Sequence, residues 1–249
     1  MKGLDRRGHS RLASRTAAVL GWMASPVGGL LPPAAMSELL FELRALRARA
    51  SSVMGRPRLG PPPYRVELGA AGRSIAGWIG VDVAPGSDVM ADVRWRIPLP
   101  NGSCEAIYSE HLVEHLRFRD EVPQLFAECR RLLRPGSPIR ISVPDAALYV
   151  RGYVEGDLSR LAKLHPWGST PMTTLNWAFH GYGHRFGWDA ETLVAVMNEA
   201  GFDSLEVREH GDSRYPGLAL DRPERAVEST YVEGRAPDRV MTGWGGKAN

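Results

Sequence analysis

The sequence predicts an α/β fold in which helices cover both faces of a mostly parallel β-sheet, preceded by a basic helical extension. Short apolar and β-branched runs alternate with helical segments from residue 64 onward, as in proteins with a parallel sheet. Apolar residues make up 43% of the chain and charged residues 24%, which is ordinary for a globular protein. The 249 residues suffice to bury the core of one such domain with an appendage.

The basic character of the chain belongs to its N-terminal part. Residues 1–60 contain ten Lys or Arg and three Asp or Glu, a net charge of +7, whereas residues 61–249 contain 21 and 25, a net charge of −4. The remainder of the chain therefore gives no electrostatic reason to expect a nucleic-acid partner.

We expect one helix in this extension, from about Ser37 to Ala50, with Ser37 as its N-cap. Four leucines form one apolar stripe on it: Leu39, Leu40, Leu43 and Leu46. The stripe is expected to pack on the following domain, and a homodimer contact is the alternative.

The sequence favours a cytoplasmic protein without a membrane span. No run approaches the roughly 20 unbroken apolar residues that a spanning helix needs. Arg6-Arg7 before the apolar run 17–31 loosely resembles a twin-arginine export signal, but Gly21 and Pro26 interrupt that run. The two cysteines, Cys104 and Cys129, have neither disulfide nor metal-ligand spacing.

A proline-rich linker at 57–63 separates the extension, 1–60, from the main domain, 61–237, and a tail follows at 238–249. Strands are predicted at 64–68, 78–83, 88–91, 106–109, 139–143, 205–209 and 227–232, and helices at 112–116, 121–133 and 190–200. Only residues 70–78 separate the first two strands, whereas a parallel crossover usually needs a dozen or more residues. Any helix there must be very short.

Acidic and small residues follow the predicted strands, where an open parallel sheet binds its ligands. Carboxylates at successive strand ends suit ribose hydroxyls and an amine, because ionised acids accept hydrogen bonds strongly. They suit a pyrophosphate poorly, and a complete G-x-G-x-x-G is missing, so a dinucleotide site is disfavoured. These positions are Glu67, Gly69-Ala70-Ala71-Gly72, Asp82, Asp92, Glu110-His111 and Asp145.

The ordered set from Val66 to Asp145 resembles the small class I methyltransferases that use S-adenosylmethionine (SAM), in particular the type-11-like subgroup. The segments that carry the resemblance are the glycine bend, Gly80-Val81-Asp82-Val83, Ala91-Asp92-Val93, residues 99–107, residues 112–116 and residues 131–136. The resemblance implies a Rossmann-like fold and SAM as cofactor, with Asp82 binding the ribose. The implied cofactor-binding residues are Glu67, Gly69, Ala71, Gly72, Asp82, Asp92, Val93 and Glu110. Ala71 replaces a usual glycine, and Cys104-Glu105 replace a usual Phe-Asp.

Methyl transfer to a hydroxyl requires a general base within hydrogen-bond reach. Asp145 and His111 follow the two central strands and are the first candidates, and His184 is the third. An aromatic segment at 165–188 is expected to form an acceptor pocket, or else a lid that packs on the domain. Its candidate substrate-binding residues are Trp167, Trp177, His180, Tyr182 and Trp188. Residues 184–202 resemble a segment of a subgroup with members linked to polysaccharide biosynthesis, which suggests a saccharide or related small molecule as acceptor.

Three alternatives remain open. His111-Leu112-Val113-Glu114-His115 matches the H-x-x-E-H pattern of inverted zinc peptidases, although it stands within an α/β pattern. The departures at Ala71 and Cys104-Glu105 leave room for a non-catalytic SAM-binding partner protein. No metal-ligand set is assigned, but a divalent ion at the acceptor, held by Asp145 and a histidine, is compatible with the sequence.

Overall fold

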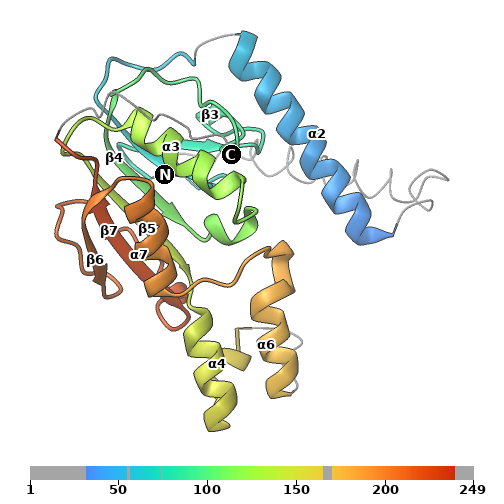
Figure 1. Cartoon of the computed structure of the whole chain (residues 1–249). Helices are drawn as coiled ribbons and strands as arrows, with labels where there is room; N and C mark the ends of the chain where they lie inside the picture. The colour runs from blue at the N-terminus through green and yellow to red at the C-terminus, as the bar shows by residue number, and fades with distance from the viewer. Residues whose placement is uncertain (1–31, 55–56, 74, 165–169, 239–249) are drawn as a thin grey trace, which may run out of the picture. The chain divides into compact units, whose positions relative to one another are not determined.

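The computed structural model describes residues 32–54, 57–73, 75–164 and 170–238 (Figure 1). The chain divides into two compact units, residues 1–46 and residues 47–249. The arginine pair at 6–7, the apolar run 17–31 and Trp167 lie outside the described residues. No helix among those that are described is long and apolar enough to cross a membrane.

Helix α2 (Pro33–Met54) begins earlier than the sequence suggested. Ser37 therefore lies inside the helix, and its expected role as N-cap is wrong. Pro33 occupies the first helical position, where a missing N–H costs nothing because that donor has no partner within the helix. The packing of the leucine stripe stays a prediction.

Seven strands form one sheet in the order β3-β2-β1-β4-β5-β7-β6 (Figure 1). They are β1 (Tyr64–Leu68), β2 (Ile79–Asp82), β3 (Val89–Met90), β4 (Cys104–Glu110), β5 (Pro138–Pro144), β6 (Asp203–Arg208) and β7 (Ser229–Arg235). The first five strands pair in parallel, and β7 pairs antiparallel with both β5 and β6. The mostly parallel, Rossmann-like sheet is confirmed, and its order reverses at β1 and β4, the point where such sheets bind ligands.

The main core lies between one face of the sheet and helices α3 (Glu121–Leu132) and α7 (Ala190–Glu199). Alternate residues of β5 enter this core, as expected for a strand with two different faces. They are Ile139, Ile141 and Val143, all fully buried. Figure 1 shows α3 and α7 on this side of the sheet.

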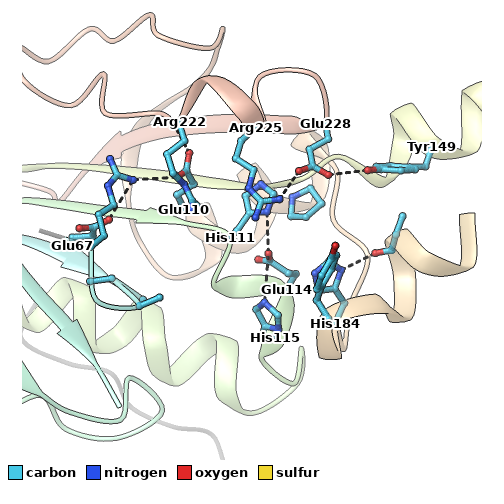
Figure 2. A pocket seen from close by; sticks show the side chains of 17 residues that line it. Glu67, Glu110, His111, Glu114, His115, Tyr149, His184, Arg222, Arg225 and Glu228 are labelled. Atoms are coloured by element: carbon cyan, nitrogen blue, oxygen red, sulfur yellow. Dashed lines mark hydrogen bonds and ion pairs between the residues drawn. The ribbon is translucent and has the colours of Figure 1, made fainter. Parts of the chain in front are cut away.

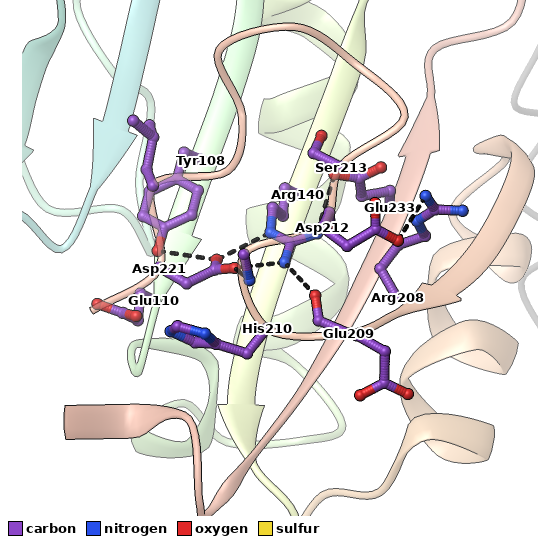
Figure 3. A network of polar contacts seen from close by, with 12 residues as sticks. Tyr108, Glu110, Arg140, Arg208, Glu209, His210, Asp212, Ser213, Asp221 and Glu233 are labelled. Carbon is purple, nitrogen blue, oxygen red and sulfur yellow. Dashed lines mark hydrogen bonds and ion pairs between the residues drawn. The ribbon is translucent and has the colours of Figure 1, made fainter. Parts of the chain in front are cut away.

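Loops, rather than helices, cover the second face of the sheet around β4 and β5 in the described part of the chain. Arg140 of β5 points to this face and is fully buried. Its guanidinium group binds Asp221 at 2.5 Å and Glu233 at 2.9 Å and donates to the carbonyl oxygen of Asp212 at 3.0 Å (Figure 3). A buried charge is tolerated only when it is paired and hydrogen-bonded, so Arg140 fixes the segment between β6 and β7 against the sheet.

The crossover from β1 to β2 contains no helix among its described residues, 69–73 and 75–78. The chain instead turns through four residues with left-handed φ values: Gly69 (+74°), Ala71 (+47°), Gly72 (+82°) and Gly77 (+79°). Glycine adopts such angles without steric cost, which explains how so short a link joins two parallel strands. Turn hydrogen bonds from Arg73 to Ala70 and from Trp78 to Ile75 complete it.

Three helices after β5 were not anticipated from the sequence: α4 (Ala146–Glu155), α5 (Ser159–Ala162) and α6 (Pro171–His180). They share a small core of their own, made of Tyr149, Leu158, Leu161 and Ala178. Helices α4 and α6 stand side by side beyond the carboxyl end of β5 (Figure 1). They therefore border the edge of the sheet where ligands are expected.

Candidate functional site

A cavity of about 290 Å³ opens at the carboxyl ends of β1, β4 and β5 (Figure 2). Its walls come from five segments that are far apart in the sequence. The principal lining residues are Glu67, Gly69, Ala71, Arg73, Glu110, His111, Glu114, His115, Pro144, Tyr149, Tyr182, His184, Arg222, Arg225 and Glu228. The predicted strand ends of β1 and β4 thus share one cavity.

Glu67, at the end of β1, offers a buried oxygen without a partner. Its side chain is only 5% exposed, and Oε2 accepts no hydrogen bond. Burial raises the pKa of Glu67 to about 6, with Glu110 adding to the effect and Arg73 opposing it from 3.5 Å. A buried carboxylate of this kind gains most from a cationic donor, which is what the ammonium group of SAM provides.

Asp82, at the end of β2, ties the glycine bend to the sheet. Its Oδ2 accepts a hydrogen bond from the backbone N–H of Ala71 at 2.9 Å, and Oδ1 accepts one from Ala84 at 2.8 Å. Each carboxylate oxygen has a second lone pair, so Asp82 retains capacity for ribose hydroxyls. Asp82 itself is not among the cavity-lining residues, but Ala71, which it holds, is. Gly72 is exposed, and a side chain added at this position would meet no other atom within 4 Å.

Asp92 and Val93, which follow β3, do not line the cavity. Asp92 is 2% exposed, and both of its oxygens are engaged by Arg94, with Arg49 joining at 2.8 Å. Against the effect of burial, hydrogen bonds and the charge of Arg94 hold the pKa of Asp92 below its usual value, helped by Arg49. Val93 belongs to the main core. The cofactor role of these two residues stays a prediction, and their present contacts are structural.

Glu110, at the end of β4, is bound by two arginines. Arg222 contacts it through both Nε and its backbone N–H, the latter at 2.9 Å, and Arg73 Nη1 lies 3.3 Å away. Farther along the wall, Arg225 binds Glu228 at 2.6 Å, and the Tyr149 hydroxyl donates to Glu228 at 2.9 Å. The cavity therefore has a charged but internally compensated wall (Figure 2).

His111 directly follows β4 with φ +53°, a conformation that residues other than glycine rarely adopt. Its Nε2 lies 2.8 Å from Ser229 Oγ, and its Nδ1 lies 3.6 Å from Glu114 Oε1. Burial lowers the pKa of His111 to about 2, and the charges of Arg225 and Arg222 act in the same direction. The imidazole is therefore neutral and a poor proton acceptor.

Glu114 stands between three histidines and has no hydrogen-bond partner on either carboxylate oxygen. It is 1% exposed, and burial raises its pKa to about 8. His115 Nε2 lies 3.9 Å from Glu114 Oε1, and the rings of His115 and His184 are 5.0 Å apart (Figure 2). His184 Nδ1 lies 2.7 Å from the Ala178 carbonyl oxygen and must donate to it, which leaves Nε2 with a free lone pair.

The H-x-x-E-H segment does not form the helix expected over 112–116. Only a single 3-10 turn, η2 (Val113–His115), is present, and His111 precedes it with a left-handed backbone. The two histidines of the motif therefore do not share a helix face, as a zinc peptidase of this type requires.

Asp145 does not line the cavity; its carboxylate caps α4 by accepting from Ala147 N–H at 2.9 Å. Asp145 is therefore not placed to hold a divalent ion at the acceptor, a possibility that the sequence had left open. Of the three base candidates, His111 and His184 lie in the cavity wall.

The aromatic segment contributes less to the cavity than expected. Tyr182 lines it, whereas Trp177 packs edge-on against Tyr182 and His180 is exposed outside it. Trp188 is 1% exposed and packs with Phe118 and Phe186 in the main core, so its present contacts are structural and its contact with the acceptor stays a prediction. Large aromatic rings in a core give the same sequence signal as a binding surface.

Comparisons with known proteins agree with this arrangement. Residues 78–141 match the methyltransferase domain family. A probable S-adenosylmethionine-dependent methyltransferase of Mycolicibacterium smegmatis is 26% identical over 118 residues, which are 47% of this chain and 41% of that protein. The chain thus spans about two fifths of the length of the curated relative.

Two solved structures resemble the chain more distantly. A chain of the complex between the Haloferax volcanii Trm112 methyltransferase activator and a putative methyltransferase is 16% identical, with a TM-score of 0.44, covering 82% of this chain and 95% of that one. A SAM-dependent methyltransferase of Mesorhizobium loti is 18% identical, with a TM-score of 0.45, covering 76% and 95%.

A Rossmann-like sheet with a cavity at the reversal of strand order is an arrangement in which ligands bind at the carboxyl ends of the strands. The family match narrows this class: residues 78–141 match the methyltransferase domain family, and the similar curated protein is a probable S-adenosylmethionine-dependent methyltransferase, an enzyme that uses SAM as its cofactor. Glu67, the glycine bend and Asp82 fit that cofactor, because an orphaned buried oxygen and a close-approach backbone are present where they are needed.

Proposed function

We propose that the protein transfers the methyl group of SAM to a hydroxyl group of a carbohydrate or a related hydrophilic small molecule. The polar cavity beside the glycine bend carries this proposal. Its walls offer carboxylates, guanidinium groups, imidazoles and two tyrosines, so polar side chains outnumber apolar ones among the lining residues. A polyhydroxylated acceptor satisfies such groups, whereas a purely apolar acceptor leaves them without partners.

On the cofactor side, bound SAM supplies a methyl group already activated on a sulfonium sulfur. Glu67 accepts from the ammonium group, and Asp82 accepts from the ribose hydroxyls. Gly69 and Ala71 would let the backbone approach the methionine part closely, because both are small residues in a sharp bend with left-handed angles. These residues act by positioning, which accounts for much of the rate in a displacement at an activated carbon.

On the acceptor side, the hydroxyl must lose its proton as it attacks. Glu114, His115 and His184 form the part of the wall whose lone pairs are least occupied, as the free Nε2 of His184 illustrates. We place the acceptor hydroxyl against these three residues. His111 is less suited, because its Nε2 bonds Ser229.

Methyl transfer from labelled SAM to a panel of mannosides, glucosides, phenols and amines tests the proposal. We expect turnover with at least one glycoside and a strong loss in Glu67→Gln. Glu105→Gln is the matched control, since Glu105 forms only an exposed ion pair with Arg65. Turnover restricted to phenols or amines refutes the carbohydrate part, and absence of SAM binding refutes the whole.

The alternative of a non-catalytic SAM-binding partner protein is favoured by Ala71, a non-glycine residue at a left-handed position of the cofactor bend. It predicts SAM binding in calorimetry without methyl transfer to any acceptor of the panel. The same pair of measurements therefore separates the two functions.

A further inference from the structure

Glu114, His115 and His184 present three ligand atoms within 4.8 Å of one another. Backbone hydrogen bonds fix the two segments that bring them together. The N–H groups of Arg185 and Phe186 donate to the carbonyl oxygen of Glu114, at 2.7 Å and 3.3 Å. The cluster is thus a built feature of the fold, although His184 lies about seventy residues from the adjacent Glu114 and His115 (Figure 2).

Glu114 lacks the cation that a buried carboxylate needs. Both oxygens are buried without a hydrogen bond, and Arg225, a basic side chain of the same wall, is already bound to Glu228. Such a group carries a large desolvation penalty unless it is paired or coordinates a metal. The side chain faces the cavity between His115 and His184, where a cation has room.

The ring of His184 is oriented by a hydrogen bond on the side away from the cluster. His184 donates Nδ1–H to the Ala178 carbonyl oxygen at 2.7 Å. Metal-binding histidines are typically oriented in this way, because the second ring nitrogen then presents its lone pair to the ion.

We propose that Glu114, His115 and His184 bind a divalent transition-metal ion in the wall of the cavity. Two imidazole nitrogens and one carboxylate oxygen suit zinc, iron(II) or manganese(II) better than magnesium. Ligands around tetrahedral zinc lie about 3.4 Å apart, so small side-chain rotations close the cluster onto the ion. Three protein ligands leave coordination positions open toward the cavity.

The role of the ion rests on the proposed function. An acceptor hydroxyl that occupies an open position becomes more acidic, as metal-bound water does. Its O–H proton leaves to water in the open cavity. The oxygen then forms a bond to the methyl carbon while the carbon–sulfur bond of SAM breaks, releasing the neutral thioether. A strong side-chain base is then unnecessary.

Calorimetric titration of the chelator-treated full chain with ZnCl₂, MnCl₂, anaerobic FeCl₂ and MgCl₂ tests the site without SAM or acceptor. We expect about one transition-metal ion per chain, detected also by elemental analysis of the purified protein. Glu114→Gln and His184→Ala should weaken binding roughly 100-fold or more. His210→Gln is the matched control, since His210 lies outside the cluster, with a hydrogen bond to the Arg222 carbonyl and a ring contact with Tyr231. SAM titration of each variant checks its folding.

Wild-type protein that binds SAM but none of the three transition metals overturns the proposal. So does metal binding that survives in both Glu114→Gln and His184→Ala. If metal is bound by these residues in a protein that does not bind SAM, the metal site stands and the proposed function falls.

Discussion

Replacing Glu67 by glutamine should stabilise the fold while weakening cofactor binding. The pKa of Glu67 rises from 4.5 to about 6, mainly because the side chain is buried. The folded state therefore holds a proton that the unfolded state releases, and stability falls as pH rises through this window. At pH 8 the penalty is about 2 kcal/mol, the free-energy equivalent of that pKa difference.

Urea unfolding of the wild type and Glu67→Gln at several pH values measures this effect. Glutamine has the same shape without the charge, so the variant should be about 2 kcal/mol more stable at pH 8 and nearly equal to the wild type at pH 4. Glu105→Gln is the control for removing a carboxylate, because Glu105 is exposed.

The same variant should bind SAM about 10- to 100-fold more weakly, because a charge-assisted hydrogen bond to the ammonium group is lost. Wild-type affinity should also decline below about pH 6, where Glu67 becomes protonated. A variant that is less stable at pH 8 and binds SAM as tightly as the wild type would refute both the burial argument and the assignment of Glu67.

Three further substitutions separate cofactor binding from structure. Asp82→Ala should weaken SAM binding by about 10-fold or more in calorimetry, and unchanged affinity would contradict its ribose role. Arg140→Met should destabilise the protein by about 3–5 kcal/mol, because two buried carboxylates lose their partner. Calorimetric scans should show a fall of about 10 °C in Tm, and a change under 2 °C would refute the stabilising role of Arg140. Trp188→Phe should lower the free energy of unfolding in urea by about 1–3 kcal/mol yet leave the KM for the acceptor unchanged. The reverse pattern would indicate that Trp188 contacts the acceptor.

The sequence predicted elements whose signals are local. Strand β1 was placed without error, and α3 and β5 within one residue at each end, because apolar runs end at clear breakers such as Pro135-Gly136 and Pro144. Helix α4 was missed, since Val150, Gly152 and Val154 are poor helix formers. Its helical state depends on the small core that it shares with α5 and α6, and such tertiary support is invisible in the sequence.

The site was predictable in location but not in detail. The topological rule correctly gathered Glu67, the glycine bend and Glu110 at one edge of the sheet. It could not foresee that Asp92 would be engaged by Arg94 and by Arg49, 43 residues away, and would not line the cavity. Glu114 and His115 were visible only as part of a peptidase-like motif, whereas the structure joins them to His184 instead.

One short segment connects the buried charge on the second face of the sheet to the cavity at the carboxyl ends of the strands. Asp221 binds Arg140 on the second face, while its neighbour Arg222 binds Glu110 in the cavity wall. Leu220, one residue earlier, accepts a hydrogen bond from Arg73 of the cofactor bend at 2.7 Å. The three contacts connect the bend after β1, the end of β4 and the middle of β5 to the same three residues. Loss of the Arg140 pair should therefore disturb the cavity wall, although Arg140 itself lies on the opposite face of the strand from the main core.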